Sequence, residues 1–327
     1  MSILRSIRIA ALLGLSVALA ACSSGGDSAD GSASPTGSTS PATTLTVETN
    51  NGPVEVPANP KRVVALDNTS FQTLRALGVT PVALPKPLLP ASLSAWADNP
   101  GIADIGTHRE PKLEEINAAE PDLIVGGKRF AQYTEKLTEI APVIDLAPSV
   151  EEPGYADALK AQTTTLAEIF GQPEVAKQLN AALDASIAEA AGLTHGQTVF
   201  LANHNGGKID NGAGRMAPLI EPLNMTDVFA GRSGGSDSVH NDSGLAPETI
   251  AEANPDWMIV LDRDAITGGD GAVSAKATIE AQKAWANTTF VTKNQILYLD
   301  AEFYVTEGIQ AYTAFYGQLA KALRDAG

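Results

Sequence analysis

The chain has 327 residues, of which 22 are Lys or Arg and 38 are Asp or Glu, so its formal net charge at pH 7 is −16. Nucleic-acid binders need surplus basic side chains to meet phosphates, and this acidic balance therefore excludes nucleic acid as a partner. Cys22 is the only cysteine, which excludes a disulfide within the chain.

The first 22 residues have the pattern of an export signal. Arg5 and Arg8 precede an apolar run over residues 9–21, which is too short to cross a membrane as a helix. The run ends in Leu-Ala-Ala directly before Cys22, and this resembles a bacterial lipobox, whose cysteine is acylated and becomes the mature N-terminus. We therefore expect residues 1–21 to be a signal peptide and acylated Cys22 to anchor the exported protein to the outer face of the cell membrane. The alternative is an ordinary signal with a chance cysteine.

The segment that follows is a tether, and the folded body begins after it. Residues 22–43 are rich in Gly, Ser and Pro and cannot build a core, so we interpret them as the acylated cysteine and a flexible linker. Beyond residue 44, short apolar runs alternate with stretches of helix length, which predicts an α/β fold with mainly parallel sheets. The expected strands span residues 63–66, 79–84, 123–125, 143–146, 198–201, 257–261 and 296–299.

Two segments, residues 113–125 and 247–259, repeat one pattern of helix, Pro-Asp turn, buried strand and a following arginine. At one constant offset, Glu114 matches Glu248, Ile116 matches Ile250, Pro121-Asp122 matches Pro255-Asp256, and Arg129 matches Arg263. Several matches at one offset predict two lobes of similar build. Ligands of open α/β sheets bind beyond the carboxyl ends of the strands, so we expect both arginines to face a shared cleft.

A long helix is expected between the lobes. Gly171-Gln-Pro173 ends one helix and starts another, whose apolar residues recur at helical spacing to about Ala191. The predicted organisation is an N-terminal lobe over residues 44–170, an inter-lobe helix over 171–194 and a C-terminal lobe over 195–327. The alternative is a surface helix that belongs to one lobe.

At this point the sequence resembles a known family, the substrate-binding proteins of ABC importers for iron-siderophores and vitamin B12. The resemblance covers about residues 45–325. It depends on Pro60-Lys-Arg-Val-Val-Ala-Leu66, Ile105-Gly106 with Leu113-Glu-Glu-Ile116, both Pro-Asp segments, and Tyr298-Leu-Asp300. It implies two similar lobes joined by one long rigid helix, with the ligand cleft between them, in a monomer.

Within that family, the chain is most similar to ferric catecholate-siderophore-binding lipoproteins. Their arginine positions correspond here to Arg129 after the first Pro-Asp strand, Arg215 in Gly212-Ala-Gly-Arg215, and Arg263 after the second Pro-Asp strand. Guanidinium groups suit anionic ferric catecholates because they stay charged and present fixed forks of donors. The resemblance also implies that His240 and Tyr304 ligate ferric iron when the siderophore leaves its coordination incomplete. The alternatives are surface ion pairs, a solvated histidine and a rim tyrosine.

Two further residues are candidates for the ligand site. Asn68 lies in Asp67-Asn-Thr-Ser70, which has the pattern of a helix start whose amides could face the cleft. His204, in Asn203-His-Asn-Gly, is a second histidine that could line the pocket. The alternative for Asn68 is a helix cap without contact to a ligand.

The expected partners are a ferric siderophore and an ABC permease dimer with its ATPase. In the family, one glutamate on each lobe meets arginines of the permease, and Glu114 and Glu248 hold these positions here. A local reason also exists, because a carboxylate in the first turn is favoured by the helix dipole.

We expect a binding protein with no intrinsic cofactor. An enzyme is disfavoured because the sequence has no His-Glu-x-x-His, Gly-x-Ser-x-Gly or phosphate-loop motif. The predicted function is capture of a ferric catecholate-type siderophore and its delivery to a membrane permease for iron uptake. The alternatives are a heme or cobalamin carrier of the same fold and a surface sensor without transport.

Overall fold

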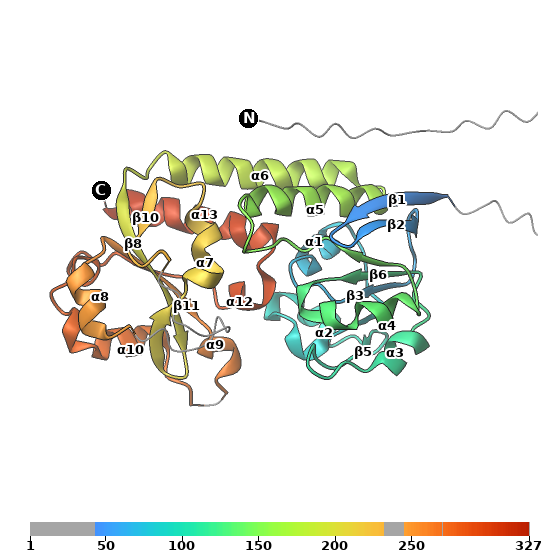
Figure 1. Cartoon of the computed structure of the whole chain (residues 1–327), viewed down its shortest axis with the longest axis horizontal. Helices are drawn as coiled ribbons and strands as arrows, with labels where there is room; N and C mark the ends of the chain where they lie inside the picture. Colours follow the sequence, from blue (N-terminus) through green and yellow to red (C-terminus); the bar gives the residue numbers. More distant parts are fainter. Residues whose placement is uncertain (1–42, 232–244, 270, 327) are drawn as a thin grey trace, which may run out of the picture. The chain divides into compact units, whose positions relative to one another are not determined.

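The computed structural model describes residues 43–231, 245–269 and 271–326 (Figure 1). The predicted signal peptide, Cys22 and His240 lie outside these residues. Among the described residues, no helix is both long and apolar enough to cross a membrane.

The first sheet has five parallel strands in the order β5-β4-β3-β6-β7. Its strands are β3 (Val63–Ala65), β4 (Ala83–Leu84), β5 (Ala103–Asp104), β6 (Leu123–Gly126) and β7 (Val143–Asp145). Successive side chains of a strand point to opposite faces, and both faces are buried here. Val63 and Ala65 enter one hydrophobic core, while Val64 enters another on the opposite face. Helices α1 (Phe71–Ala76) and α5 (Tyr155–Ile169) cover the first face, and α3 (Leu113–Ala118) and α4 (Thr134–Thr138) cover the second.

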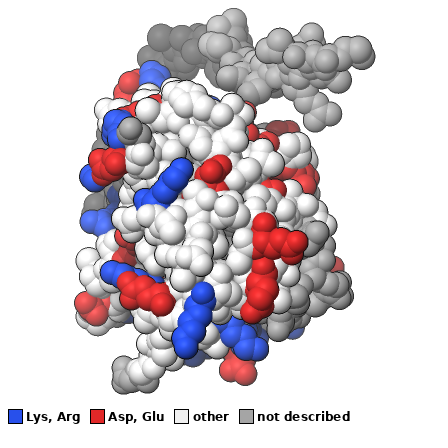
Figure 2. Space-filling model, turned by 90° about the vertical axis from the view of Figure 1, so that its left-hand side faces the viewer, with Lys and Arg blue, Asp and Glu red and all other residues white. Residues whose placement is uncertain are grey.

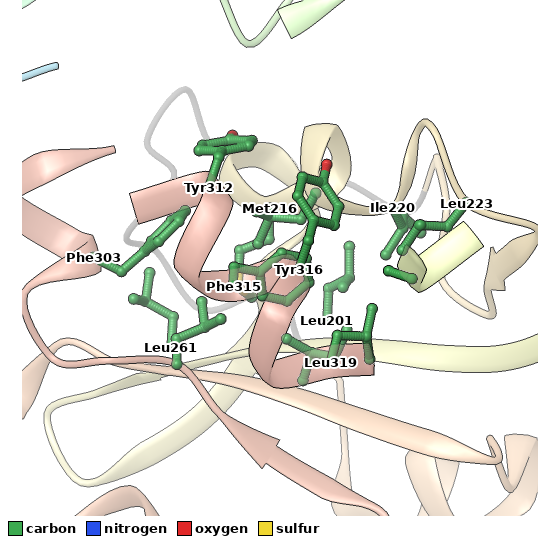
Figure 3. Close-up of a cluster of buried hydrophobic side chains, with 14 of the residues drawn as sticks. Leu201, Met216, Ile220, Leu223, Leu261, Phe303, Tyr312, Phe315, Tyr316 and Leu319 are labelled. Atoms are coloured by element: carbon green, nitrogen blue, oxygen red, sulfur yellow. The ribbon is translucent and has the colours of Figure 1, made fainter. Parts of the chain in front are cut away.

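The second sheet is built in the same way, with the order β10-β8-β11-β12 and β9 antiparallel to β8. Its strands are β8 (Gln197–Asn205), β9 (Lys208–Asn211), β10 (Met225–Asp227), β11 (Trp257–Asp262) and β12 (Ile296–Tyr298). Leu201 and Leu261 point into a core that they share with α7 (Ala213–Ile220) and α13 (Ile309–Ala326), as Figure 3 shows. The opposite face is covered by α8 (Pro247–Ala253), α10 (Ala275–Ala281) and α11 (Thr289–Thr292).

Apart from one long helix between the sheets, the described elements that remain are short. They are the hairpin β1 (Thr44–Thr49) with β2 (Gly52–Pro57), helices α2 (Ser94–Ala97), α9 (Asp264–Thr267) and α12 (Phe303–Thr306), and the 3-10 helices η1 (Lys86–Leu88), η2 (Ala91–Leu93), η3 (Lys128–Tyr133) and η4 (Lys283–Trp285). On the face in Figure 2, acidic and basic side chains are both dispersed among uncharged ones.

All seven expected strands are present, so the predicted α/β class is confirmed. The expected strand at 79–84 is reduced to Ala83–Leu84, because Pro81 and Pro85 flank it and proline has no N–H to give to a ladder. Five described strands were not predicted: β1, β2, β5, β9 and β10. Two of these strands, β5 and β10, have only two and three residues, which is too short for a periodic signal.

The sequence repeat is also a structural repeat. Helices α3 and α8 are each followed by a left-handed residue, Glu120 at φ 43° and Asn254 at φ 44°, and then by Pro-Asp. Each aspartate then accepts a hydrogen bond from a backbone N–H group at the beginning of the first strand of its sheet, just before β3 or within β8. Asp122 accepts from Arg62, at 2.9 Å, and Asp256 accepts from Thr198, at 2.8 Å.

Helix α6 (Pro173–Ala191) is the predicted long helix, and it contributes to the cores of both sheets. Ala176 packs with the first sheet, and Leu183 packs with the second. Helix α5 lies beside α6 in Figure 1 and does the same, through Leu166 and Leu159 respectively. The two sheets are therefore tied together by a pair of helices rather than by α6 alone.

Candidate functional site

A cavity of about 580 Å³ lies at the carboxyl ends of β3, β6 and β11. This volume suits a small chelate, since ligand pockets of proteins span about 300–1,000 Å³. In the first sheet, β3 and β6 are neighbours at the point where the strand order reverses, which is where ligands of open α/β sheets bind. Its lining includes Asn68 after β3, Arg129 after β6, Arg263 after β11, Arg215 on α7 and Tyr304 on α12.

Three arginines surround the ring of Tyr304. The Cζ atoms of Arg129, Arg215 and Arg263 lie 5.7, 4.9 and 5.4 Å from the ring centroid. An aromatic face attracts a cation at such distances, and a buried ring holds it in place. Tyr304 is only 7% exposed, so it forms a fixed floor for the three guanidinium groups. The structure thus brings together four of the residues that the sequence predicted for this site.

Hydrogen bonds fix the arginines further. Arg263 donates from Nε to the Tyr304 hydroxyl, at 3.0 Å, and from a terminal nitrogen to Asn205. Arg129 donates to the backbone carbonyl of Tyr304, at 3.2 Å. Arg215 donates to the carboxylate of Glu307, which also lies 3.8 Å from Arg129. These bonds hold the charged groups in one arrangement before any ligand arrives, which lowers the entropic cost of binding.

Two glycines make this close approach possible. A Cβ at Gly127 would lie 2.7 Å from the side chain of Asp67, so the turn after β6 can run against the loop after β3 only without a side chain. A Cβ at Gly308 would lie 2.2 Å from the backbone oxygen of Thr69. The segment that carries Tyr304 therefore packs directly on the first sheet's loop.

Asp67 is a buried acid at the rim of the cavity. Burial raises its pKa to about 6, although hydrogen bonds from the side chain and backbone of Thr69 counteract part of this increase. Gln162 of α5 also donates to it, at 2.9 Å. Its neighbour Asn68 lines the same cavity and donates to the carbonyl of Thr306, at 3.2 Å.

The structure does not bring His204 into the cavity. Its side chain is fully buried, with Nδ1 2.8 Å from Asp262 and Nε2 3.1 Å from Thr278 of α10. The reason is the two-residue period of β8, which puts His204 on the same face as Phe200 and Ala202, whereas the cavity lies past the strand ends. Our expectation that it lines the pocket is therefore corrected.

Several cavity residues were missed at the sequence level, and Glu307, His108 and Tyr155 are among those with titratable side chains. Glu307 follows Tyr304 closely, and an acid so near a predicted site tyrosine was a usable signal. His108 precedes α3 in a loop without any motif. Burial lowers its pKa, and the positive charges of Arg129 and Arg109 lower it further. Tyr155 starts α5, and burial raises the pKa of its hydroxyl well above the usual value.

The two predicted docking residues lie away from the cavity. Glu114 and Glu248 are exposed, each in the first turn of its helix, α3 or α8. Neither residue lines the cavity.

The sequence matches the periplasmic binding protein family over residues 63–303. The chain belongs to this family. The petrobactin-binding protein YclQ of Bacillus subtilis is 31% identical over 282 residues, which cover 83% of this chain and 84% of YclQ. The ferric-anguibactin-binding protein FatB of Vibrio anguillarum is 26% identical over 81% of this chain and 82% of its own length.

Solved structures of two similar proteins have the same fold. The crystal structure of YclQ superimposes with a TM-score of 0.75 at 27% identity, over 86% of this chain and 99% of YclQ. The catecholate-siderophore binding protein VctP of Vibrio cholerae has a TM-score of 0.75 at 24% identity, over 86% of this chain and all of VctP. The described residues therefore have the fold of a periplasmic binding protein, with two β-sheets that are each covered by helices.

Proposed function

We propose that this protein is the extracytoplasmic solute-binding component of an ABC importer and that it captures a ferric catecholate-type siderophore for iron uptake. One observation carries the proposal: three guanidinium groups surround Tyr304 on the floor of a cavity of about 580 Å³. The names of the relatives, which bind petrobactin and ferric anguibactin, support the same class of ligand.

The chemistry of the floor fits an anionic chelate. A ferric catecholate carries its negative charge on the oxygens around the metal, and a planar guanidinium binds such oxygens with two parallel donors. Desolvation inside the cavity strengthens these bonds compared with those at an open surface. Iron enters as part of the cargo, so the protein needs no resident metal.

A fluorescence titration tests this proposal. The purified protein is titrated with ferric catecholates, ferric hydroxamates, heme and cobalamin, and quenching of its tryptophans reports binding. Arg129→Ala and Arg263→Ala should each weaken ferric-catecholate binding by about 1.5–3 kcal/mol, the usual range for a hydrogen bond to a charged group. Arg324→Ala is the matched control, because Arg324 pairs with Glu189 between α13 and α6, away from the cavity.

Two results would contradict the proposal. One is a pair of cavity variants whose affinities equal that of the parent protein. The other is a clear preference of the parent protein for heme or cobalamin, which would favour the alternative cargo of the same fold.

Direct ligation of iron is a second step of the proposal. When a siderophore supplies only four oxygens, the Tyr304 hydroxyl and His240 would fill the vacant positions, since phenolate oxygen and imidazole nitrogen both bind ferric iron. The Tyr304 hydroxyl lies at the cavity, 3.0 Å from Nε of Arg263, and so is near the expected position of the metal. His240 lies outside the described residues.

Delivery to a permease is the third step. Glu114 and Glu248 are exposed in corresponding turns of the structural repeat, and two equivalent acidic groups suit a permease with two-fold symmetry. Each could meet the same kind of basic pocket. Glu115 and Glu252 are exposed on the same helices and are the matched control residues.

Anchoring through Cys22 completes the proposed function. An acyl chain there, joined through the Gly/Ser/Pro tether, would keep the binding protein at the membrane near its permease. Fractionation of cells that express Cys22→Ser tests this. The variant should move from the membrane fraction to the soluble fraction, and an unchanged distribution would refute anchoring by this residue.

A further inference from the structure

Glu307 is an acid on the cationic floor of the cavity. Its carboxylate bridges two of the three arginines: one oxygen accepts from Arg215, and the other lies 3.8 Å from a terminal nitrogen of Arg129. The Glu307 side chain is only 14% exposed, so water screens these ion pairs weakly. Asp67 also lines the cavity, but its oxygens are taken up by Thr69 and Gln162.

The backbone at Glu307 is unusual for a glutamate. The residue ends α12 in the left-handed conformation, with φ 52° and ψ 15°. Helices commonly end in this conformation with glycine, because a Cβ crowds the backbone there. A glycine is present one residue later, at Gly308, where the contact with Thr69 requires it. The chain thus carries a charged side chain where glycine would be easier, as it also does at Glu120 outside the cavity. The role of Glu307 therefore rests on its contacts with the arginines.

The charges explain what this carboxylate does in the empty protein. Three guanidinium groups, all with Cζ within 5.7 Å of one ring centroid, repel one another. Glu307 pairs with Arg129 and Arg215, whereas Arg263 is held by Tyr304 and Asn205. One carboxylate therefore offsets part of the repulsion and occupies donors that an anionic ligand would use.

We propose that Glu307 is an internal counter-ion that competes with the anionic cargo for Arg129 and Arg215. This inference deepens the proposed function and rests on it. The competition makes Glu307 a specificity-determining residue, because its charge repels a trianionic chelate more than a monoanionic one. The carbonyl and ring of Tyr304 also hold Arg129, and the ring holds Arg215, so removal of the Glu307 charge removes the competitor without releasing the arginines.

The first test needs no siderophore. Thermal unfolding of Glu307→Gln is compared with that of the parent protein at low ionic strength, with and without added sulfate. The variant should unfold at a lower temperature, because its three arginines have lost their counter-ion, and sulfate should raise its melting temperature more than that of the parent. Glu189→Gln removes an exposed carboxylate that also pairs with an arginine, and it should show no such sulfate response.

The second test compares ligands of different charge. Glu307→Gln should bind a trianionic ferric tris-catecholate about tenfold more tightly than the parent protein does at low ionic strength, with a smaller gain for a monoanionic ferric bis-catecholate. High salt should reduce both gains. Unchanged or weaker binding of the trianion by the variant would overturn the inference.

The two tests separate failure of the inference from failure of the proposed function. If the parent protein binds no ferric catecholate at all, the proposed function is wrong. The sulfate response then decides by itself whether Glu307 acts as a counter-ion. If the parent binds and the variant gains nothing, the function stands and the role of Glu307 is refuted.

Discussion

Asp67 should make the stability of this protein depend on pH in a direction that can be worked out. Burial raises its pKa to about 6, from an ordinary value of 3.8. The folded protein therefore holds a proton at pH values where the unfolded chain has released it. The stability that comes from this bound proton is fully present below the pKa of Asp67 in the unfolded chain, and it is lost as the pH rises through about 6.

The magnitude follows from the size of the shift. One pKa unit corresponds to about 1.4 kcal/mol, so the free energy of unfolding should fall by about 2–3 kcal/mol between pH 4 and pH 7 on account of Asp67 alone. Other carboxylates titrate in the same range. The quantity to measure is therefore the difference between the parent protein and Asp67→Asn, which lacks only this titration.

The assay is urea unfolding at a series of pH values, followed by the fluorescence of the buried tryptophans. The advantage of the parent over Asp67→Asn should decrease by that amount from pH 4 to pH 7. Thr69→Val is the control, because it keeps the carboxyl group but removes a hydroxyl bond that lowers the Asp67 pKa. In Thr69→Val, the fall in the free energy of unfolding that is due to Asp67 should extend to higher pH. A difference between parent and Asp67→Asn that stays constant or grows with pH would refute the reasoning.

Three other predictions follow from the geometry. Gly308→Ala should lower the free energy of unfolding by about 1–3 kcal/mol in urea melts, since its Cβ would meet a backbone oxygen at 2.2 Å. The control Gly317→Ala, in an open position on α13, should raise the free energy of unfolding by about 0.5–1 kcal/mol, and equal effects of the two substitutions would contradict the packing argument. Tyr304→Phe should remove a visible charge-transfer band from the complex with a tetradentate ferric catecholate and leave a hexadentate complex unchanged; a band that persists would exclude ligation by the hydroxyl. Replacing Glu114 and Glu248 together by Ala should abolish iron uptake by cells at unchanged ligand affinity, and normal uptake at wild-type abundance would leave these residues as helix-stabilising acids only.

The sequence by itself determined the elements that depend on local pattern. Short apolar runs that alternate with stretches of helix length predicted the strands, because burial on both faces of a parallel sheet needs continuous apolar residues. The repeat predicted that Arg129 and Arg263 follow corresponding strands, β6 and β11, each next to the first strand of its sheet. Gly171-Gln-Pro173 predicted the start of α6, since proline is favoured in the first helical turn.

Only the tertiary structure decided how these residues meet. Arg129, Arg215 and Arg263 converge on Tyr304 because the ends of two sheets and the short helix α12 pack around one cavity, and such contacts between distant segments leave no mark on local periodicity. The position of His204 could not be predicted from the sequence for the same reason. Its ring contacts Asp262 because β8 and β11 pair in a register that places the two residues side by side. This difference has a physical cause. Burial of one face of a helix or strand requires apolar residues at a regular spacing, and that spacing can be read from the sequence. A polar site consists of single side chains from distant segments, and their proximity depends on the packing of the whole domain.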